Sequence, residues 1–149
     1  MARRSWRAFL DTSALIAGLF SPTGSAHEVL RLFEVGIVEL IISRQVLVEA
    51  DRNLTAKLPA LLDEYHDFLH RLSPHVIEDP SREAVERAAS VIHHADAPIL
   101  AAAIAARVDY LITWNTRHFH KKPVQEFVSF RIVTPAEFLA GFRRALLED

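Results

Sequence analysis

The segment RAFLDTS, residues 7–13, decides how the rest of the chain is interpreted. Its apolar half is typical of a buried strand, and a helical pattern begins directly behind it at Ala14. Asp11 therefore lies at the carboxyl end of the predicted strand, where open α/β sheets bind their ligands. Two interpretations of this carboxylate remain open: it binds a metal ion, or it caps the following helix, as Asp, Thr and Ser commonly do.

The composition indicates one globular domain, which we place at residues 1–149. Of the 149 residues, 50% are hydrophobic and 24% are charged, which suits a packed core and a soluble surface. The formal net charge of −2 argues against a generally basic nucleic-acid-binding protein, so such a partner would need a local patch or a bound cation. The absence of cysteine excludes disulfides, thiol catalysis and zinc fingers, and it fits the reducing cytoplasm in which we expect the protein.

No stretch predicts a contact with membranes. The longest apolar run, Ala97–Ala106, is too short to cross a bilayer. Residues 1–7 are basic, but Asp11 interrupts the apolar stretch behind them, so we expect no signal peptide.

Short apolar stretches alternate with helical patterns along the chain. This alternation favours a single α/β domain with a mainly parallel central sheet flanked by helices. The segment 134–137 predicts a capping box at the start of the last helix, with Thr as the cap and Glu three residues later. The predicted strands are residues 7–10, 39–42, 75–77, 110–113 and 131–133.

A second informative acid, Asp96, stands directly before an apolar helix. At about 100° per residue, it projects near the middle of the apolar arc formed by residues 99, 100, 103 and 104. An acid on a buried helix face is unusual. Capping of the helix is the alternative, but a cap does not explain why the carboxylate points inward.

Asn115 and Glu49 are expected near the same place. Asn115 follows the predicted strand 110–113, so parallel pairing with the first strand would bring it beside Asp11; a turn residue is the alternative. Glu49 lies on the helix that Ser43 is expected to cap. It projects about 60° outside the buried stripe of that helix, so it can lean into a cleft, whereas the alternative is a solvated side chain.

Asp11, Glu49 and Asp96 come from three separate elements, and together they predict a cation site. Neighbouring carboxylates repel one another, so some would bind protons unless a cation compensates them. Mg²⁺ and Mn²⁺ prefer such oxygen ligands, and an ion held there can polarise a phosphodiester and activate a water. Hydrogen bonds to ligands, waters or phosphate oxygens are expected from Thr12, Ser13, Thr113 and Asn115.

In this pattern the chain resembles the PIN-domain nucleases, and within them the VapC-like ribonuclease toxins of bacterial toxin–antitoxin pairs. The resemblance implies a parallel sheet flanked by helices, Mg²⁺- or Mn²⁺-dependent cleavage of RNA, an antitoxin partner encoded nearby and often a homodimer. Each motif alone is weak, but four in this order are fairly specific. The matching pieces are LDTSALI at 10–16, Glu49, DAPILAAA at 96–103 and YLITWNTRHF at 110–119.

The resemblance also implies roles for single residues. Asp11, Glu49 and Asp96 match the three core acids of the family, which bind the metal and form the catalytic site. Asn115 completes the catalytic set, at a position where many members have Asp and some have Asn. The change removes one negative charge, which should weaken a second metal site more than the first.

A basic segment follows Asn115 and is a candidate for RNA contacts. Trp114 can stack on a base, although packing of this ring and solvation of the charges are the alternatives. The candidate contacts are Trp114, Arg117, His118, His120, Lys121 and Lys122, together with Arg3, Arg4 and Arg7 near the amino terminus.

Three other functions remain open. A phosphoryl-transfer enzyme of the haloacid-dehalogenase type needs a second Asp where Ser13 stands. A zinc site built from residues 93–96, or from the histidines at 118 and 120, lacks the helical HExxH pattern. The non-enzyme alternative is a PIN-like binding or interaction module with weak or no nuclease activity, and Asn115 is the residue that keeps it open.

Overall fold

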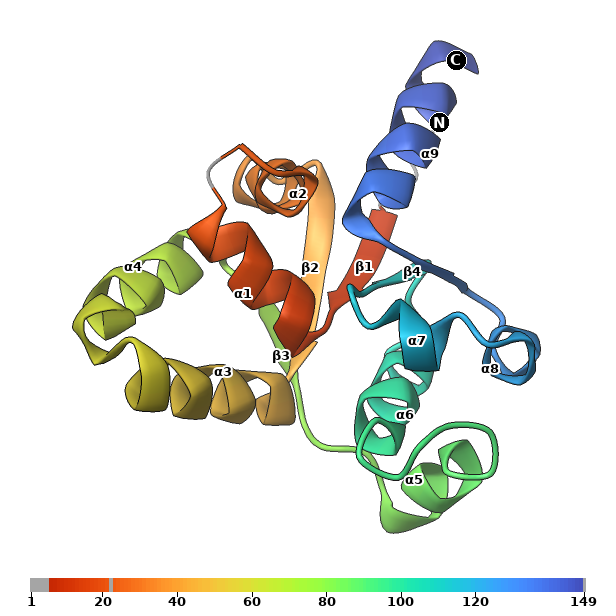
Figure 1. Cartoon of the computed structure of the whole chain (residues 1–149). Helices are drawn as coiled ribbons and strands as arrows, with labels where there is room; N and C mark the ends of the chain where they lie inside the picture. The colour runs from red at the N-terminus through yellow and green to blue at the C-terminus, as the bar shows by residue number, and fades with distance from the viewer. Residues whose placement is uncertain (1–5, 22, 149) are drawn as a thin grey trace.

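A parallel sheet of five strands forms the centre of the computed structural model, which describes residues 6–21 and 23–148 (Figure 1). The strand order is β3-β2-β1-β4-β5, and helices flank the sheet. Two candidate RNA contacts, Arg3 and Arg4, lie outside the described residues. The strands are β1 (Trp6–Leu10), β2 (Val38–Ser43), β3 (His75–Ile77), β4 (Tyr110–Ile112) and β5 (Arg131–Val133).

The central strand β1 pairs in parallel with β2 on one side and with β4 on the other. Its residues Ala8, Phe9 and Leu10 are at most 1% exposed, as expected for a strand covered on both faces. The predicted parallel pairing of the strands that precede Asp11 and Asn115 is therefore confirmed. Asp11 and Asn115 therefore follow neighbouring strands at the same edge of the sheet.

The helices connect the strands and account for the remaining apolar patterns. Ser43 caps α3 as predicted, since its Oγ accepts a hydrogen bond of 3.3 Å from the Val46 N–H. The expectation that Ile104 is buried is wrong: it is 38% exposed, because the last turn of α6 borders a surface groove. The helices are α1 (Thr12–Phe20), α2 (Ser25–Glu34), α3 (Arg44–Lys57), the 3₁₀ turn η1 (Pro59–Leu61), α4 (Leu62–Leu72), α5 (Arg82–Ala88), α6 (Ala97–Ala105), α7 (Thr116–Phe119), α8 (Lys122–Phe127) and α9 (Pro135–Glu148).

None of the helices in the described part of the chain combines the length and the hydropathy that a membrane crossing requires. Helix α9 extends away from the sheet at the top of Figure 1.

Helices α1 and α2 pack closely at Gly18. A Cβ at this position would lie 2.5 Å from Leu30 Cδ1 and 3.0 Å from the Ala26 carbonyl oxygen. We expect Gly18→Ala to lower the free energy of unfolding by about 1–3 kcal/mol, because an overpacked core must shift side chains and backbone. Urea denaturation measures the effect. The control is Gly141→Ala in α9, where a Cβ meets nothing within 4 Å; equal stabilities of the two variants would contradict the prediction.

The capping box predicted at the start of α9 is present. The Thr134 N–H donates to Glu137 Oε1 at 2.9 Å, and the Glu137 N–H donates to Thr134 Oγ1 at 3.2 Å. The hydrogen bond from the Thr134 backbone is the main reason why the pKa of Glu137 is lowered. The carboxylate therefore stabilises the fold above its ordinary pKa, and this stabilisation is lost as the pH falls through the lowered value.

We expect Glu137→Ala to lower the free energy of unfolding by less than about 1 kcal/mol at neutral pH, because the lost bond is largely exposed to solvent. The difference from the unchanged chain should shrink as the pH falls below 4.5, the ordinary pKa of the group. Urea midpoints measured at neutral and acidic pH check this. A difference that does not vary with pH would mean that the carboxylate charge plays no part in the cap.

Candidate metal centre

A cleft of about 430 Å³ opens where β1 and β4 end. Three acids line it, and neither Lys nor Arg occurs among the described lining residues. The cleft therefore brings together the four residues predicted as catalytic from the sequence. Its walls are formed by Asp11, Thr12, Ser13, Ile16, Glu49, Asn53, Ala95, Asp96, Ile99, Asn115 and Phe119.

Asp11 is only 5% exposed and is held by three donors. The Ala14 N–H and the Ser13 hydroxyl donate to Oδ1 at 3.0 and 2.8 Å, and the Thr113 hydroxyl donates to Oδ2. Burial raises the pKa of Asp11 above its ordinary value; the three donors lower it, and the charge of Asp96 raises it further. Asp11 thus caps α1 and also faces the cleft, so the two interpretations from the sequence are compatible.

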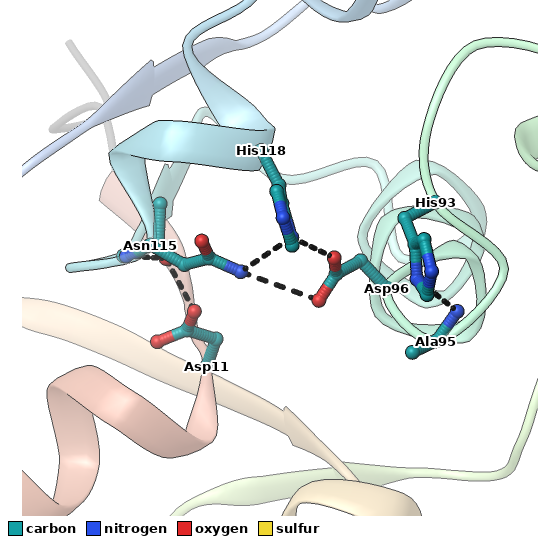
Figure 2. Close-up of polar contacts among 7 residues, drawn as sticks. Asp11, His93, Ala95, Asp96, Asn115 and His118 are labelled. Carbon is teal, nitrogen blue, oxygen red and sulfur yellow. Dashed lines mark hydrogen bonds and ion pairs between the residues drawn. The ribbon is translucent and has the colours of Figure 1, made fainter.

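Asp96 occupies the N-cap position of α6, but its side chain makes no capping hydrogen bond. Instead, Asn115 Nδ2 donates to Oδ1 at 3.3 Å, and His118 Nδ1 lies 2.5 Å from Oδ2 (Figure 2). The carboxylate is therefore directed toward α7 across the cleft and not toward its own helix. This is the inward direction that the helical projection indicated.

Glu49 reaches the cleft from α3. The Thr12 hydroxyl donates to its Oε2 at 2.8 Å, and Gln45 Nε2 donates to its Oε1 at 2.9 Å. Both partners are neutral, so neither of them compensates the negative charge of Glu49. The Thr12 contact links α3 to the start of α1.

The hydroxyl groups predicted to support the site connect the loops that follow β1 and β4. The Asn115 N–H donates to Thr113 Oγ1 at 2.9 Å, while the Thr113 hydroxyl donates to Asp11. The Trp114 N–H donates to Ser13 Oγ at 3.3 Å. These bonds fix the two loops relative to each other. The hydroxyls of Ser13 and Thr113 donate directly to Asp11, and the hydroxyl of Thr12 donates directly to Glu49.

The predicted RNA contacts fall into two groups. Trp114, at 42% exposed, and Arg117 and Lys121 are on the surface. The other described candidates have acidic partners within the protein: His118 with Asp96, His120 with Glu137 at 3.6 Å, Arg7 with Glu39 at 3.3 Å and Lys122, which is itself exposed, with Glu126 at 3.8 Å.

Within residues 6–21 and 23–148, no three histidine or acidic side chains are close enough together to hold a metal ion. This result argues against the zinc sites considered at residues 93–96 and at 118–120. It also means that Asp11, Glu49 and Asp96 line one cleft without meeting at one point.

The donor set nevertheless fits a hard divalent cation. The carboxylates and the Asn115 amide supply oxygen ligands, which Mg²⁺ and Mn²⁺ prefer. The acids lie in a cleft whose described lining has no Lys or Arg, and Asp11 and Asp96 raise each other's energy when both are charged. Mg²⁺ usually keeps several waters, so these ligands need not all contact the ion directly.

Comparisons with known proteins agree with this geometry. The sequence profile of the PIN domain matches residues 7–117. Among solved structures, the chain is similar to PAE2754 from Pyrobaculum aerophilum, with a TM-score of 0.61, 19% identity and coverage of 91% of this chain and 88% of that one. It is also similar to VapBC2 from Rickettsia felis, solved bound to a DNA fragment from its promoter, with a TM-score of 0.60, 19% identity and coverage of 85% and 96%. No curated protein matches the sequence.

Proposed function

Because the chain belongs to the PIN domain family, whose members are nucleases, we propose that it is a Mg²⁺- or Mn²⁺-dependent endoribonuclease. Its reaction is the hydrolysis of RNA phosphodiester bonds, and its biological role is that of the toxin in a type II toxin–antitoxin pair. The observation that carries the proposal is the cleft in which Asp11, Glu49 and Asp96 gather beside Asn115.

In the proposed mechanism, Asp11, Glu49 and Asp96 bind the cation and Asn115 completes the catalytic set. A bound cation would polarise the phosphodiester and lower the pKa of an attacking water. The chain itself supplies orientation: Ser13, Ala14 and Thr113 hold Asp11 in one position. The parallel pairing of β1 with β4 keeps Asp11 and Asn115 together before substrate binds, which is the preorganisation that positioned catalytic groups require.

RNA would reach the cleft past Trp114, whose exposed ring can stack on a base. The surface cations Arg117 and Lys121 are proposed to contact phosphates. A cognate antitoxin, a homodimeric state and a cytoplasmic location complete the proposal. The structural similarity to VapBC2 supports the antitoxin, and the resemblance to VapC-like toxins supports the homodimer. The absence of cysteine is compatible with the cytoplasmic location.

The test is cleavage of an end-labelled RNA pool by the purified protein. We expect cleavage with Mg²⁺ or Mn²⁺, none with EDTA, and recovery when excess Mg²⁺ is added back. A DNA pool of the same sequence tests whether the substrate is restricted to RNA. RNA binding without cleavage in the presence of either ion would instead support the alternative, a PIN-like module that acts by binding.

Asn115→Asp tests how the charge of the cleft governs metal affinity. The change removes an N–H donor to Asp96 and places a like charge beside it. In EDTA we expect a loss of about 1.5–3 kcal/mol of stability, as for a hydrogen bond to a charged group. Added Mg²⁺ should bind more tightly than to the unchanged chain and reduce this loss, which thermal unfolding at several Mg²⁺ concentrations measures.

The matched control is Asn53→Asp, because Asn53 lines the same cleft from α3 and is exposed. It adds the same charge without removing a bond to Asp96. Destabilisation of Asn115→Asp that is equally large with and without Mg²⁺ would contradict the prediction.

A further inference from the structure

His118 separates the cleft from a neighbouring pocket. One side of its ring faces Asp96, and the residue also lines a pocket of about 320 Å³ with His93 and Lys121. The side chains of His118 and Asp96 are 35% and 19% exposed, so their contact is partly shielded from water. A hydrogen bond in such a place holds its partner better than a surface contact does.

The contact fixes the tautomer of His118. An ionised carboxylate can only accept hydrogen bonds, so Nδ1 of His118 must carry a hydrogen to bond Asp96 at 2.5 Å. The nearby Asn115 Nδ2, at 3.4 Å from the same nitrogen, is then a second donor and not a partner of the ring. Two N–H groups therefore converge on the Asp96 carboxylate, as Figure 2 shows.

The ring of His118 is itself supported by His93. The two rings are stacked, with centroids 5.8 Å apart and planes inclined by 22°. His93 is held in turn by the Ala95 N–H, which donates to its Nδ1 at 3.1 Å. The loop that carries Asp96 thus also supports the ring that bonds Asp96; Figure 2 shows the bond between His93 and Ala95 beside the contact between His118 and Asp96.

We propose that His118 is a positioning residue, whose Nδ1–H keeps the Asp96 carboxylate directed into the cleft while His93 holds the imidazole ring. The inference rests on the proposed role of Asp96 as a metal ligand. Partners of metal ligands orient them, and losing such a partner reduces metal affinity or activity by about 10- to 100-fold. This assigns His118 to the metal centre and not to the RNA surface where the sequence placed it.

Two substitutions separate the hydrogen bond from the packing. His118→Asn keeps an N–H near the position of Nδ1 but removes the ring, whereas His118→Phe keeps a ring against His93 but removes the donor. We expect His118→Phe to weaken Mn²⁺ binding by about 10- to 100-fold and His118→Asn to stay within a few-fold of the unchanged chain. Calorimetric titration with Mn²⁺ measures this, and thermal unfolding shows that both variants fold. The opposite order of affinities would overturn the proposal.

A contact with RNA predicts a different pattern. Both variants would then raise KM for RNA while Mn²⁺ affinity stays unchanged, and this result would also overturn the positioning role. For the positioning role we instead expect a reduced kcat at limiting Mn²⁺ in His118→Phe and a kcat close to that of the unchanged chain in His118→Asn.

A measurement on the metal-free protein distinguishes failure of this inference from failure of the proposed function. In ¹⁵N spectra of the imidazole groups we expect the Nδ1-protonated tautomer for His118, and its loss in Asp96→Ala. Protonation at Nε2 alone would overturn the positioning role. If the unchanged chain shows the expected tautomer but binds no Mn²⁺, the contact is real and the proposed metal centre is wrong.

Discussion

Asp96→Asn is expected to reduce RNA cleavage by more than about 100-fold, which exceeds the usual effect of losing a partner of a metal ligand. The substitution removes a negative charge from the cleft while changing the shape of the side chain very little. An amide is a much weaker ligand for a hard cation than a carboxylate, so the loss should appear as reduced Mn²⁺ affinity and reduced kcat together.

The fold should survive this substitution. The amide oxygen of the new Asn can still accept the hydrogen bond from His118 Nδ1, and Asp96 makes no capping bond to α6 that the change would break. Asp51→Asn is the matched control, because Asp51 lies exposed on α3 and pairs with His66 at 3.0 Å. Single-turnover cleavage at several Mg²⁺ concentrations provides the comparison. Activity of Asp96→Asn within a few-fold of the control would remove Asp96 from the metal centre.

Asp11→Asn should abolish cleavage while stabilising the metal-free protein. Burial is the largest influence on Asp11 and raises its pKa, so the folded protein binds this proton more tightly than the unfolded chain does. The contribution of Asp11 to stability is therefore favourable at low pH. It is lost as the pH rises from the ordinary value of 3.8 through the raised one, so the charged group destabilises the fold near neutral pH.

A neutral Asn at position 11 avoids this penalty at every pH. It can still accept from Ser13 and Ala14, but it can no longer accept from the Thr113 hydroxyl with a second oxygen. That loss offsets about 1 kcal/mol of the gain. Because the penalty from burial is the larger effect, the stability advantage of the variant over the unchanged chain should increase with pH.

Thermal unfolding in EDTA and in Mg²⁺ checks both halves of this prediction. In EDTA near neutral pH the variant should melt at a higher temperature, by about 2–4 °C for each kcal/mol in a chain of this size. Mg²⁺ at a hundredfold excess over its Kd should add about 2.7 kcal/mol to the unchanged chain and little to the variant, and this reverses their order. A variant that is less stable than the unchanged chain in EDTA would show that the buried charge is already compensated.

Much of this arrangement was predictable from the sequence because it depends on short-range patterns. All five strands were predicted within two residues of their observed ends. The central strand β1 was the clearest case, since a strand covered on both faces is a continuous apolar run. The proximity of Asp11 and Asn115 followed from the parallel pairing of their strands. Glu49 could be placed only by its angle on α3, and its contact with Thr12 could not be predicted because it depends on how α1 and α3 pack.

The contact between His118 and Asp96 was missed because the two residues are 22 positions apart and belong to different elements. The basic residues around His118 favoured an RNA contact and obscured its geometry. A local signal did exist: His118 follows Asn115 by three residues at the start of α7, and residues with this spacing share one helix face. The side chains of Asn115 and His118 therefore project toward the same edge of the sheet.

The pairing of the first strand with β4 also has a consequence for protein synthesis. Asp11 leaves the ribosome early, but Thr113, which donates to it, follows 102 residues later, which takes roughly 5–20 s at 5–20 residues per second. Before Thr113 and Asn115 have been synthesised, the emerging chain cannot form the complete cleft. The order in which the residues are translated therefore delays assembly of the cleft until most of the chain has been made.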